Sequence, residues 1–522
     1  MRLQRLYIGD FKNLRSFSID FADSLISVLV GQNGTGKSNV LESLILIFRD
    51  LDLGEPPSFE YALEYVCRGA EIEIVAETKG RVPRITIDGR EISSRDFSRG
   101  GKEGGTYLPK YLFGYYSGPS NRMEEHFEKH QAKFSNDLLA GVDQPLRPLL
   151  YARLVHSQFV LLSFFSASDD RDRRFLNDYL RIVDLDSVLF VLRKPEWAST
   201  QRAKLPDADP RFWGARGVVQ TFLDRLYERA LAPLRIKHRK SKGSSADRMY
   251  LFLAEKARLQ ELAAVYSGSG VDHQQSFFKA LESMYISDLI EDVRARVRLR
   301  SVDGALTFRE LSEGEQQLLT VLGLMRFTRE EEALFLLDEP DTHLNPAWSL
   351  RYLELLRDIG GTQESSHIVM ATHDPLVIAG LSRSDVQVMR RDPTGKVFAE
   401  HPYEDPKGMG ISGLLTSDIY GLRSELDLET IRMLDRKRSL AIRPDLTPDE
   451  ESELGRLNEE VGQLDLTRSA RDPYYKLFVE AMTHAEEAGG LRTTTLTPEQ
   501  QERQRDLAFE IVRELRSKDG RG

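Results

Sequence analysis

Cysteine is almost absent from this sequence, because Cys67 is the single cysteine among 522 residues. One thiol excludes an intrachain disulfide and a cysteine-rich zinc site, and it is typical of a reducing cytoplasm. Long apolar runs are missing as well, since none approaches the ~18 residues needed to span a bilayer. The first residues also lack an apolar segment of the signal-peptide type. We therefore expect a cytoplasmic protein without a membrane anchor.

Surplus positive charge is missing too, because 72 lysines and arginines face 82 aspartates and glutamates, which gives a net charge of −10. This balance disfavours a surface that is basic throughout, so a nucleic-acid contact would have to come from a local patch. The most basic run spans 235–242, mostly within a loop predicted at 237–248, and its cations are Arg235, Lys237, Arg239, Lys240 and Lys242. Two interpretations stay open for it: a solvated loop, or a contact with a phosphate backbone.

Strand patterns dominate residues 1–118. Apolar and polar residues alternate in some stretches, while others are short continuous apolar runs suited to buried strands. The alternating stretches are 3–11, 16–21, 71–78 and 84–92, and the apolar runs are 25–30 and 110–118. A turn is expected at Asp88 and Gly89. Because an amphipathic helical pattern follows residue 38, these elements predict an α/β fold.

Helical periodicity replaces the strand patterns from about residue 120 to residue 300, for example at 169–193 and 222–236. Heptads are not sustained there, which favours a compact helical insert over a long coiled-coil arm. The tail is also predicted to be mostly helical, with capping boxes at 447–450 and 497–500 that place proline at the first helical position. The expected domains are two lobes of one head (1–118 and 297–404), a mostly helical insert (119–296) and a helical C-terminal region (405–522).

The phrase GQNGTGKS at 31–38 fits the phosphate-loop pattern G-x-x-x-x-G-K-[ST] at every fixed position. It follows a predicted buried strand and opens a predicted helix, which is the context that makes such a match specific. Gly31, Gly34 and Gly36 would let the backbone wrap around a phosphate chain, with its amide hydrogens pointing toward the phosphates. Lys37 would reach the β- and γ-phosphates, and the Ser38 hydroxyl would ligate Mg²⁺. The sequence therefore predicts a site for ATP and Mg²⁺.

Two further apolar runs end in residues suited to phosphate chemistry. ALFLL at 333–337 leads into Asp338 and Glu339, and HIVMA at 367–371 leads into His373 after one threonine. Asp338 would hold the Mg²⁺ shell, and Glu339 would orient or deprotonate the attacking water. His373 is placed to contact the γ-phosphate. Glu339 and His373 are therefore the candidate catalytic residues.

The phrase LSEGEQQLL at 311–319 predicts a second anion-binding helix. Ser312 and Gly314 open this helix, so its free amides would face an anion. A nucleotide site with its own phosphate loop does not need a second such helix. The arrangement makes sense if the helix addresses the nucleotide of a facing subunit, which predicts at least a homodimer.

Together these phrases resemble the ATP-binding-cassette (ABC) class of P-loop ATPases, in the branch of RecF, SMC and overcoming-lysogenisation (OLD) proteins. The matching letters are IGDFKNLRSFSIDF, GQNGTGKSN, LSEGEQQ, LLDEPDTHLNP and ATHDP, and the resemblance covers 1–118 and 297–400. It implies an α/β head of mixed sheets with flanking helices, in which two heads sandwich two ATP molecules. The residues that it adds to the nucleotide site are Asn33, Asn39 and Glu315 and, acting in trans, Ser312 and Gly314. It also places Asp341 and His343 in a loop at the dimer seam.

The glutamine-bearing loop of this family should lie near 114–122, but that stretch contains no glutamine. The candidates for its role are Ser117, Asn121 and Gln158. Arg15 is equally consistent with a nucleotide contact and with an exposed residue at a strand end. His126 and His130, at i and i+4, could form a metal pair, but the lack of a third ligand favours a solvated helix face.

OLD nucleases carry strand-borne acidic clusters near their C terminus, and nothing after residue 405 alternates in that way. We therefore expect ATP hydrolysis without an intrinsic nuclease domain. The short insert and the helical tail resemble the ATPase subunits of bacterial antiphage systems, in particular the Septu type and ATPases found beside restriction systems. That resemblance implies a sensor or scaffold that regulates a separate nuclease, often of the HNH type. The alternative is a RecF-like, ATP-dependent DNA-binding protein of repair or recombination.

Overall fold

The structure of the protein is a computed structural model. It describes residues 1–21, 24–142, 147–167, 169–200, 205–206, 208–239, 245–266, 273–300, 305–327, 332–360, 366–443, 445–463, 506–507 and 509–511. The chain forms two compact units, Met1–Leu422 and Arg423–Gly522. Within the described ranges, no helix is both long and apolar enough to cross a membrane.

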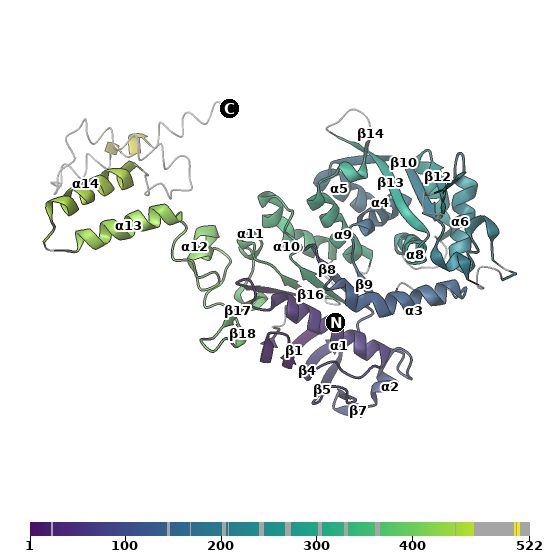
Figure 1. The fold of residues 1–522 in the computed structure, drawn as a ribbon, viewed down its shortest axis with the longest axis horizontal. Coiled ribbons are helices and arrows are strands. Elements are labelled where there is room, and N and C mark those ends of the chain that lie inside the picture. Colours follow the sequence, from purple (N-terminus) through teal and green to yellow (C-terminus); the bar gives the residue numbers. More distant parts are fainter. Residues whose placement is uncertain are drawn as a thin grey trace. The chain divides into compact units, whose positions relative to one another are not determined.

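A seven-stranded sheet of order β18-β17-β3-β16-β15-β8-β9 forms the centre of the first unit (Figure 1). Its strands are β3 (Ile26–Gly31), β8 (Tyr111–Tyr116), β9 (Leu149–Tyr151), β15 (Ala333–Asp338), β16 (Ser366–Ala371), β17 (Val386–Arg391) and β18 (Val397–Glu400). Neighbouring strands run parallel, except that β18 is antiparallel to β17. Every residue of β15 is buried, because successive side chains enter two different cores on the two faces of the sheet.

Helix α1 (Lys37–Leu53) lies in the core between this sheet and a second, six-stranded antiparallel sheet. The strands of the second sheet are β1 (Arg2–Phe11), β2 (Leu14–Asp20), β4 (Tyr61–Cys67), β5 (Ala70–Ala76), β6 (Arg84–Ile87) and β7 (Arg90–Ile92). The alternation predicted at 71–78 is present, since every second residue of β5 is buried. The strand β4 also alternates but was not predicted. The turn at Asp88 and Gly89 is confirmed as well, with φ angles of 47° and 77°. This lobe therefore matches its sequence pattern.

The region 119–296 is less helical than predicted. It contains the helices α3 (Glu128–Leu139), α4 (Val155–Ser166), α5 (Asp170–Tyr179), α6 (Gly217–Arg229), α7 (Lys256–Ala263) and α8 (His273–Ile286). It also contributes to a five-stranded antiparallel sheet of order β11-β12-β10-β13-β14. The strands are β10 (Ile182–Arg193), β11 (Leu234–Arg239), β12 (Ser245–Leu253), β13 (Ile290–Leu299) and β14 (Ala305–Thr307).

Three local predictions in this region are wrong. The helix expected over 169–193 ends at Tyr179, because β10 then pairs with β12 on one side and β13 on the other. The helix expected over 222–236 ends at Arg229 and is followed by β11. The expected loop at 237–248 includes the paired ends of β11 and β12. A mostly buried strand has few outward polar positions, so its apolar residues fit a helical period as well.

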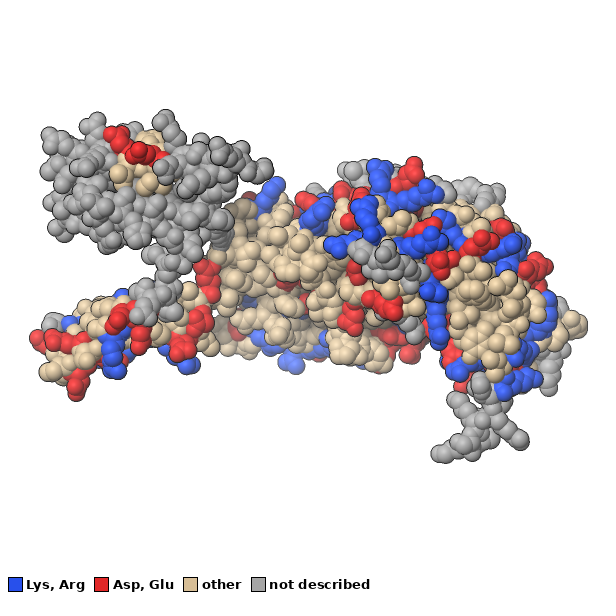
Figure 2. Space-filling view, turned by 90° about the horizontal axis from the view of Figure 1, so that it is seen from above, with Lys and Arg blue, Asp and Glu red and all other residues tan. Residues whose placement is uncertain are grey.

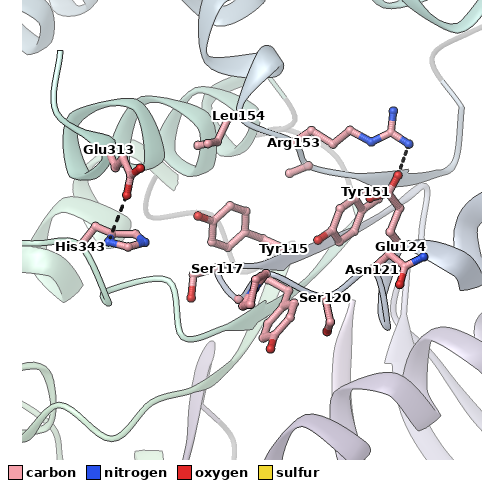
Figure 3. Close-up of a pocket in the computed structure, with 14 residues that line it drawn as sticks. Tyr115, Ser117, Ser120, Asn121, Glu124, Tyr151, Arg153, Leu154, Glu313 and His343 are labelled. Atoms are coloured by element: carbon pink, nitrogen blue, oxygen red, sulfur yellow. Dashed lines mark hydrogen bonds and ion pairs between the residues drawn. The ribbon is translucent and has the colours of Figure 1, made fainter. Parts of the chain in front are cut away.

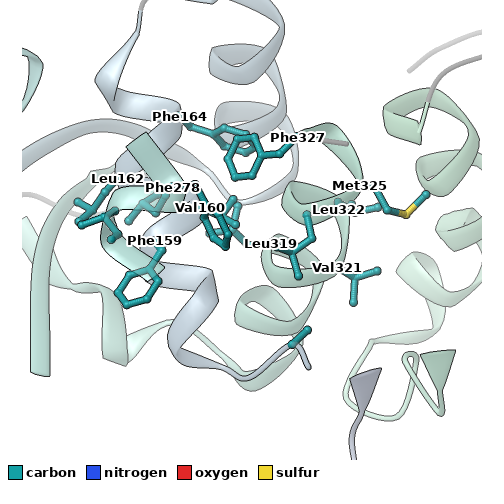
Figure 4. Packing of buried hydrophobic residues seen from close by; sticks show 14 of the residues in the cluster. Phe159, Val160, Leu162, Phe164, Phe278, Leu319, Val321, Leu322, Met325 and Phe327 are labelled. Carbon is teal, nitrogen blue, oxygen red and sulfur yellow. The ribbon is translucent and has the colours of Figure 1, made fainter. Parts of the chain in front are cut away.

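Close packing of α4 against α9 (Glu313–Phe327) joins this region to the ATPase-like head. Figure 4 shows aromatic and aliphatic side chains of both helices interleaved, among them Phe164 and Phe327. A Cβ atom at Gly323 would overlap the side chain of Val160, so only glycine permits this approach of the two backbones. The helix of the LSEGEQQ phrase is thereby fixed to the insert.

The described part of the tail is helical, as predicted. After α12 (Gly410–Thr416), the second unit contains α13 (Leu428–Ala441) and α14 (Pro448–Gln463), which contact each other. The capping box at α14 is confirmed, because the Thr447 and Glu450 side chains each bond the other's backbone N–H. The second predicted box, at 497–500, lies outside the described residues.

Candidate nucleotide site

The candidate residues gather at one edge of the seven-stranded sheet because each follows a strand that ends there. The phosphate loop follows β3, Asp338 ends β15, and His373 follows β16. Parallel strands bring their carboxyl ends to the same edge, which is where α/β sheets bind ligands. The N–H of Glu339 donates to the Ala371 carbonyl at 2.8 Å. Segments three hundred residues apart therefore meet, as the sequence predicted.

Three glycines shape the phosphate loop, since Gly31, Gly34 and Gly36 have φ angles of 146°, 82° and 97°. The Lys37 Nζ atom folds back and donates to the Gly31 carbonyl at 2.8 Å. Its largely buried position lowers the pKa of Lys37, although the nearby Glu339 and Asp338 carboxylates oppose this. The ammonium thus occupies the loop and is poised to exchange the carbonyl for phosphate oxygens.

Residues outside the motif hold the loop in place. The Asn13 Nδ2 and Arg391 Nη2 atoms donate to the Gly34 carbonyl at 2.9 Å and 2.5 Å. Asn39, expected at the nucleotide, instead donates to Asn13 at 2.6 Å and accepts from Arg122 at 2.7 Å. Asn33, in contrast, is exposed on the loop. Asn39 therefore positions the loop through its neighbours.

Asp338 fits the magnesium role. The residue is 1% exposed, and within the described part of the chain neither carboxylate oxygen has a hydrogen-bond partner. Burial raises the pKa of Asp338 to about 6, a rise that Ser38 moderates and Glu339 reinforces. Two unsatisfied carboxylate oxygens beside a serine hydroxyl suit a divalent cation, and Mg²⁺ typically takes one or two carboxylates together with substrate phosphates. Ser38 and Asp338 would therefore hold Mg²⁺.

Glu339 adopts a strained backbone, with φ at 53°, although it is not glycine. Its Oε2 atom lies 2.5 Å from the His373 Nδ1 atom. The Glu339 carbonyl accepts a hydrogen bond from the Thr342 hydroxyl at 2.9 Å, which helps to fix the turn. With this backbone conformation, the Glu339 side chain lies against His373. The two candidate catalytic residues are therefore in contact at the edge of the sheet.

Asp341 is buried, whereas His343 is exposed. The Thr372 hydroxyl donates to the Asp341 Oδ2 atom at 2.6 Å. Burial raises the pKa of Asp341 to about 7, and the Glu339 charge adds to the rise. Of the two residues expected at a dimer seam, only His343 therefore presents its side chain to the surface.

Side chains at the start of α9 cap backbone N–H groups of its first turn. Ser312 and Glu315 form a capping box, in which the Glu315 carboxylate accepts from the Ser312 N–H at 2.8 Å. A Cβ atom at Gly314 would overlap the His343 carbonyl, so this glycine lets α9 touch the 341–346 loop. None of these contacts involves the phosphate loop. Glu315 is thus occupied by the cap, and Ser312 is exposed.

A cavity of about 350 Å³ lies beside this turn, lined by Ser117, Asn121, Glu313 and His343 among others (Figure 3). Figure 3 shows Glu313 facing His343 across 3.5 Å and Arg153 paired with Glu124. Ser117 and Asn121 are therefore near the site, as expected for the family's glutamine-bearing loop. Gln158 does not line this cavity and is buried on α4.

Two other candidates have structural roles. Arg15 is exposed and lies 3.7 Å from Asp10, which favours the strand-end interpretation. The histidines at 126 and 130 do not form a solvated face, so that interpretation is wrong. The Nε2 atoms of His126 and His130 lie 2.7 Å from carboxylates of Glu42 and Asp52 on α1. In the described part of the chain, no group of three or more potential ligands of the His, Cys, Asp and Glu types is arranged around a metal position.

Sequence reasoning missed Asn13, Arg122 and Arg391. These residues are distant from one another in the chain and belong to no spacing pattern. Arg122 also bonds the buried Glu42 carboxylate, at 2.9 Å, together with Lys12 at 2.5 Å. Burial alone would raise the pKa of Glu42, but its hydrogen-bonding neighbours lower it to about 2. Only the fold reveals this support of the phosphate loop.

Family comparisons find two matches. Residues 1–90 match the family described as "AAA ATPase domain", and residues 201–379 match the family described as "AAA domain, putative AbiEii toxin, Type IV TA system". The Septu protein PtuA of Bacillus mycoides (strain KBAB4) is 24% identical over 198 residues, which are 36% of this chain and 27% of that protein. The DNA replication and repair protein RecF of Myxococcus xanthus (strain DK1622) is 30% identical over 132 residues, 23% of this chain and 34% of RecF.

The aligned part of this chain spans about a quarter to a third of the length of these two relatives. Among solved structures, an SMC head bound to the C-winged helix domain of ScpA covers 77% of this chain and 98% of its own, with 12% identity and a TM-score of 0.31. A RecF–ATP structure covers 72% and 92%, with 15% identity and a TM-score of 0.27. The family and sequence matches confirm the resemblance to AAA-type and RecF-like ATPases and include a Septu protein.

Proposed function

We propose that this protein hydrolyses ATP at the carboxyl edge of its seven-stranded sheet and regulates a separate effector nuclease in bacterial antiphage defence. The observation that carries the ATPase part is the meeting of the phosphate loop, the unsatisfied Asp338 carboxylate and the Glu339–His373 pair at one edge. Each of these groups suits one part of phosphoryl transfer to water. The defence part rests on the Septu relative.

In this mechanism, the protein acts by positioning and charge. Lys37 leaves the Gly31 carbonyl and binds the β- and γ-phosphates, while the loop amides cradle the chain. Ser38 and Asp338 would hold Mg²⁺, which would supply positive charge against the phosphates. Glu339 orients a water molecule in line with the γ-phosphorus and accepts its proton, which yields ADP and phosphate. His373 contacts the γ-phosphate side and keeps the Glu339 carboxylate in place.

The active unit in this proposal is a head-to-head homodimer. Ser312 is exposed at the start of α9 and contacts no part of its own phosphate loop through its cap. His343 is exposed beside it. Both are therefore available to a nucleotide on a facing subunit, which would be held between the phosphate loop of one head and the α9 turn of the other.

A route from the site to the tail supports the sensor role. The Tyr420 hydroxyl donates to the His373 carbonyl at 3.0 Å, and Tyr420 lies three residues before the second unit begins at Arg423. A change at His373 on ATP hydrolysis would alter the anchor of the chain that enters the second unit. We assign the helical tail to binding of the effector, a nuclease of the HNH type.

Co-purification with the product of a neighbouring nuclease gene tests the regulatory part. The nuclease should bind the wild-type protein, and its DNA cleavage should differ between the wild type and Glu339→Gln in the presence of ATP. Tyr420→Phe should keep ATP turnover but reduce this difference. The control is Tyr403→Phe, an exposed tyrosine of the same unit. Unchanged nuclease activity with every variant and nucleotide would refute the regulatory role and leave the ATPase assignment untouched.

The RecF relative favours a second candidate, ATP-dependent DNA binding. The basic run at 235–242 offers limited support, since Arg235 is bound to Asp247 through two hydrogen bonds of 2.9 Å and 2.6 Å. Figure 2 shows cationic and acidic side chains interleaved over the face that carries much of the insert. Lys237 is exposed. If DNA is bound through this run, affinity should fall steeply with salt and should weaken in Lys237→Ala.

A further inference from the structure

A second cavity, of about 320 Å³, lies at the opposite end of helix α1 from the phosphate loop. Asp52 from the last turn of α1 lines it, together with Tyr111 at the start of β8 and residues of α3. Fifteen residues of helix separate Asp52 from Lys37, which corresponds to about 22 Å. The cavity is therefore distinct from the nucleotide site.

Positive charge predominates in the walls of this cavity. Four lysine and arginine side chains line it, against two carboxylates, those of Asp52 and Asp137. The Asp52 carboxylate is already engaged, because it accepts hydrogen bonds from both Arg99 and His130. Lys133 adds an exposed cation. The remaining field in the cavity favours an anion.

Two buried cavity-lining side chains have polar atoms without partners. The Arg147 side chain is 3% exposed, and only its Nη2 atom is bonded, to Glu282 Oε1 at 2.7 Å. Among the residues that the structure describes, the Nε and Nη1 atoms of Arg147 have no partner, and neither does the Nδ1 atom of the buried His130. Burial lowers the pKa of Arg147, and the Glu282 carboxylate opposes this shift. Buried donors of this kind are rarely left unsatisfied.

We propose that this cavity is a second ligand site that binds a small phosphate-bearing anion, up to the size of a nucleoside monophosphate. Arginine suits phosphate oxygens because its planar guanidinium presents several fixed donors. The His130 Nδ1 atom can accept from a ligand hydroxyl or, when protonated, donate to an oxyanion. The rings of Tyr111 and Phe134 add apolar wall. A volume near 300 Å³ is at the lower end of the range for small-molecule sites.

Calorimetry on the full-length protein tests this site, with inorganic phosphate and AMP as the two probes. Lys37→Ala serves as the background in every sample, so that binding at the phosphate loop does not contribute. We expect both probes to bind if phosphate alone is recognised, and only AMP if the nucleoside is also required. Either result supports the site, provided that cavity substitutions weaken the binding.

The matched pair Lys133→Ala and Lys129→Ala separates the site from general charge effects. Both lysines are exposed on α3, but only Lys133 lines the cavity. Lys133→Ala should weaken the Kd at least threefold and Lys129→Ala should leave it unchanged. Arg147→Met should abolish binding; because it also removes a partner of Glu282, it is scored only if the variant melts as one folded population. No binding of either probe, or equal effects of both lysine variants, would overturn the proposal.

Discussion

The two ends of helix α1 differ in the sign of the charge that they leave unsatisfied. Considering the described residues alone, both oxygens of the buried Asp338 carboxylate lack a partner near the first turn. Beyond the last turn, two nitrogens of the buried Arg147 lack one. The first end suits a cation that accompanies a phosphate chain, and the second suits an anion alone. The comparison shows that unsatisfied buried charge identifies both candidate ligand positions, and that its sign indicates the charge of the ligand that each one suits.

Removing the chemistry at the first end should have the largest effect. Glu339→Gln keeps the side-chain size but cannot accept the proton of water, so ATP turnover should fall by at least about 100-fold while ATP still binds. Lys37→Ala should abolish binding instead. Phosphate release and equilibrium ATP binding measure the two outcomes. The exposed Glu354→Gln on α10 is the control, and normal turnover by Glu339→Gln would refute the catalytic assignment.

Asp338→Asn tests the unsatisfied carboxylate directly. Burial raises the pKa of Asp338 from an ordinary value of 3.8 to about 6. The unfolded chain thus loses this proton first, and metal-free stability falls as the pH rises from about 4 to about 6. The difference corresponds to about 3 kcal/mol. Asp338→Asn should therefore raise the melting temperature at pH 8 without metal, and not at pH 3.

Melting in the presence of Mg²⁺ and ATP tests the same carboxylate as a metal ligand. Mg²⁺ with ATP should stabilise the wild type strongly and Asp338→Asn much less, because the variant lacks the ligand charge. Asp358→Asn, at an exposed position of α10, is the control. Equal stabilisation of the wild type and Asp338→Asn would show that the cation binds elsewhere.

Glu42→Gln tests the contacts that join α1 to the segment before α3 and to the turn after β1, and its effect should be smaller. Glu42 binds Arg122 and His126 from the segment that precedes α3 and Lys12 from the turn after β1. Because the pKa of Glu42 is lowered to about 2, its contribution is present above its ordinary value of 4.5 and fades as the pH falls from there toward 2. We expect a loss of about 1 to 2 kcal/mol at pH 7, smaller at pH 3, by thermal melts. An equal loss at both pH values would contradict the ionic role.

Arg391→Ala should have the smallest effect. Arg391 is exposed and supports the phosphate loop only through the Gly34 carbonyl. We expect KM for ATP to rise by roughly two- to fivefold with kcat unchanged, since one exposed hydrogen bond is worth about 1 kcal/mol or less. Lys396→Ala, on the neighbouring turn, is the control. A fall in kcat would show that Arg391 acts on the chemistry.

The first end of α1 could be predicted from the sequence and the second could not. Lys37, Asp338 and His373 each stand in a short phrase directly after an apolar strand, so order in the chain implies position in space. The cavity at the other end uses single residues from several elements, such as Asp52, His130 and Arg147. No spacing connects them, and their unsatisfied atoms exist only once the chain is folded.

The fold was predictable where one face of an element meets water. The strand β5 alternates and was identified, because nearly half of its residues are exposed or half-buried. The strand β4 was missed, and its outward residues are only half-buried. β10 is sheltered between two strands and mostly buried, so its pattern does not distinguish strand from helix. The pairing of β10 with β13 depends on residues a hundred positions away, which no local pattern contains.

The exposed Ser312 cap, separate from its own phosphate loop, has a consequence for mixtures of subunits. In the proposed two-fold dimer, each site would combine the phosphate loop of one chain with the α9 turn of the other. A Lys37→Ala chain and a Ser312→Arg chain should each be inactive as homodimers. Their heterodimer should contain one complete site, formed by the intact loop of the second chain and the intact α9 turn of the first. When the two inactive variants are mixed in equal amounts, about half of the dimers should be heterodimers, each with one complete site of two. The mixture should therefore restore about a quarter of wild-type turnover.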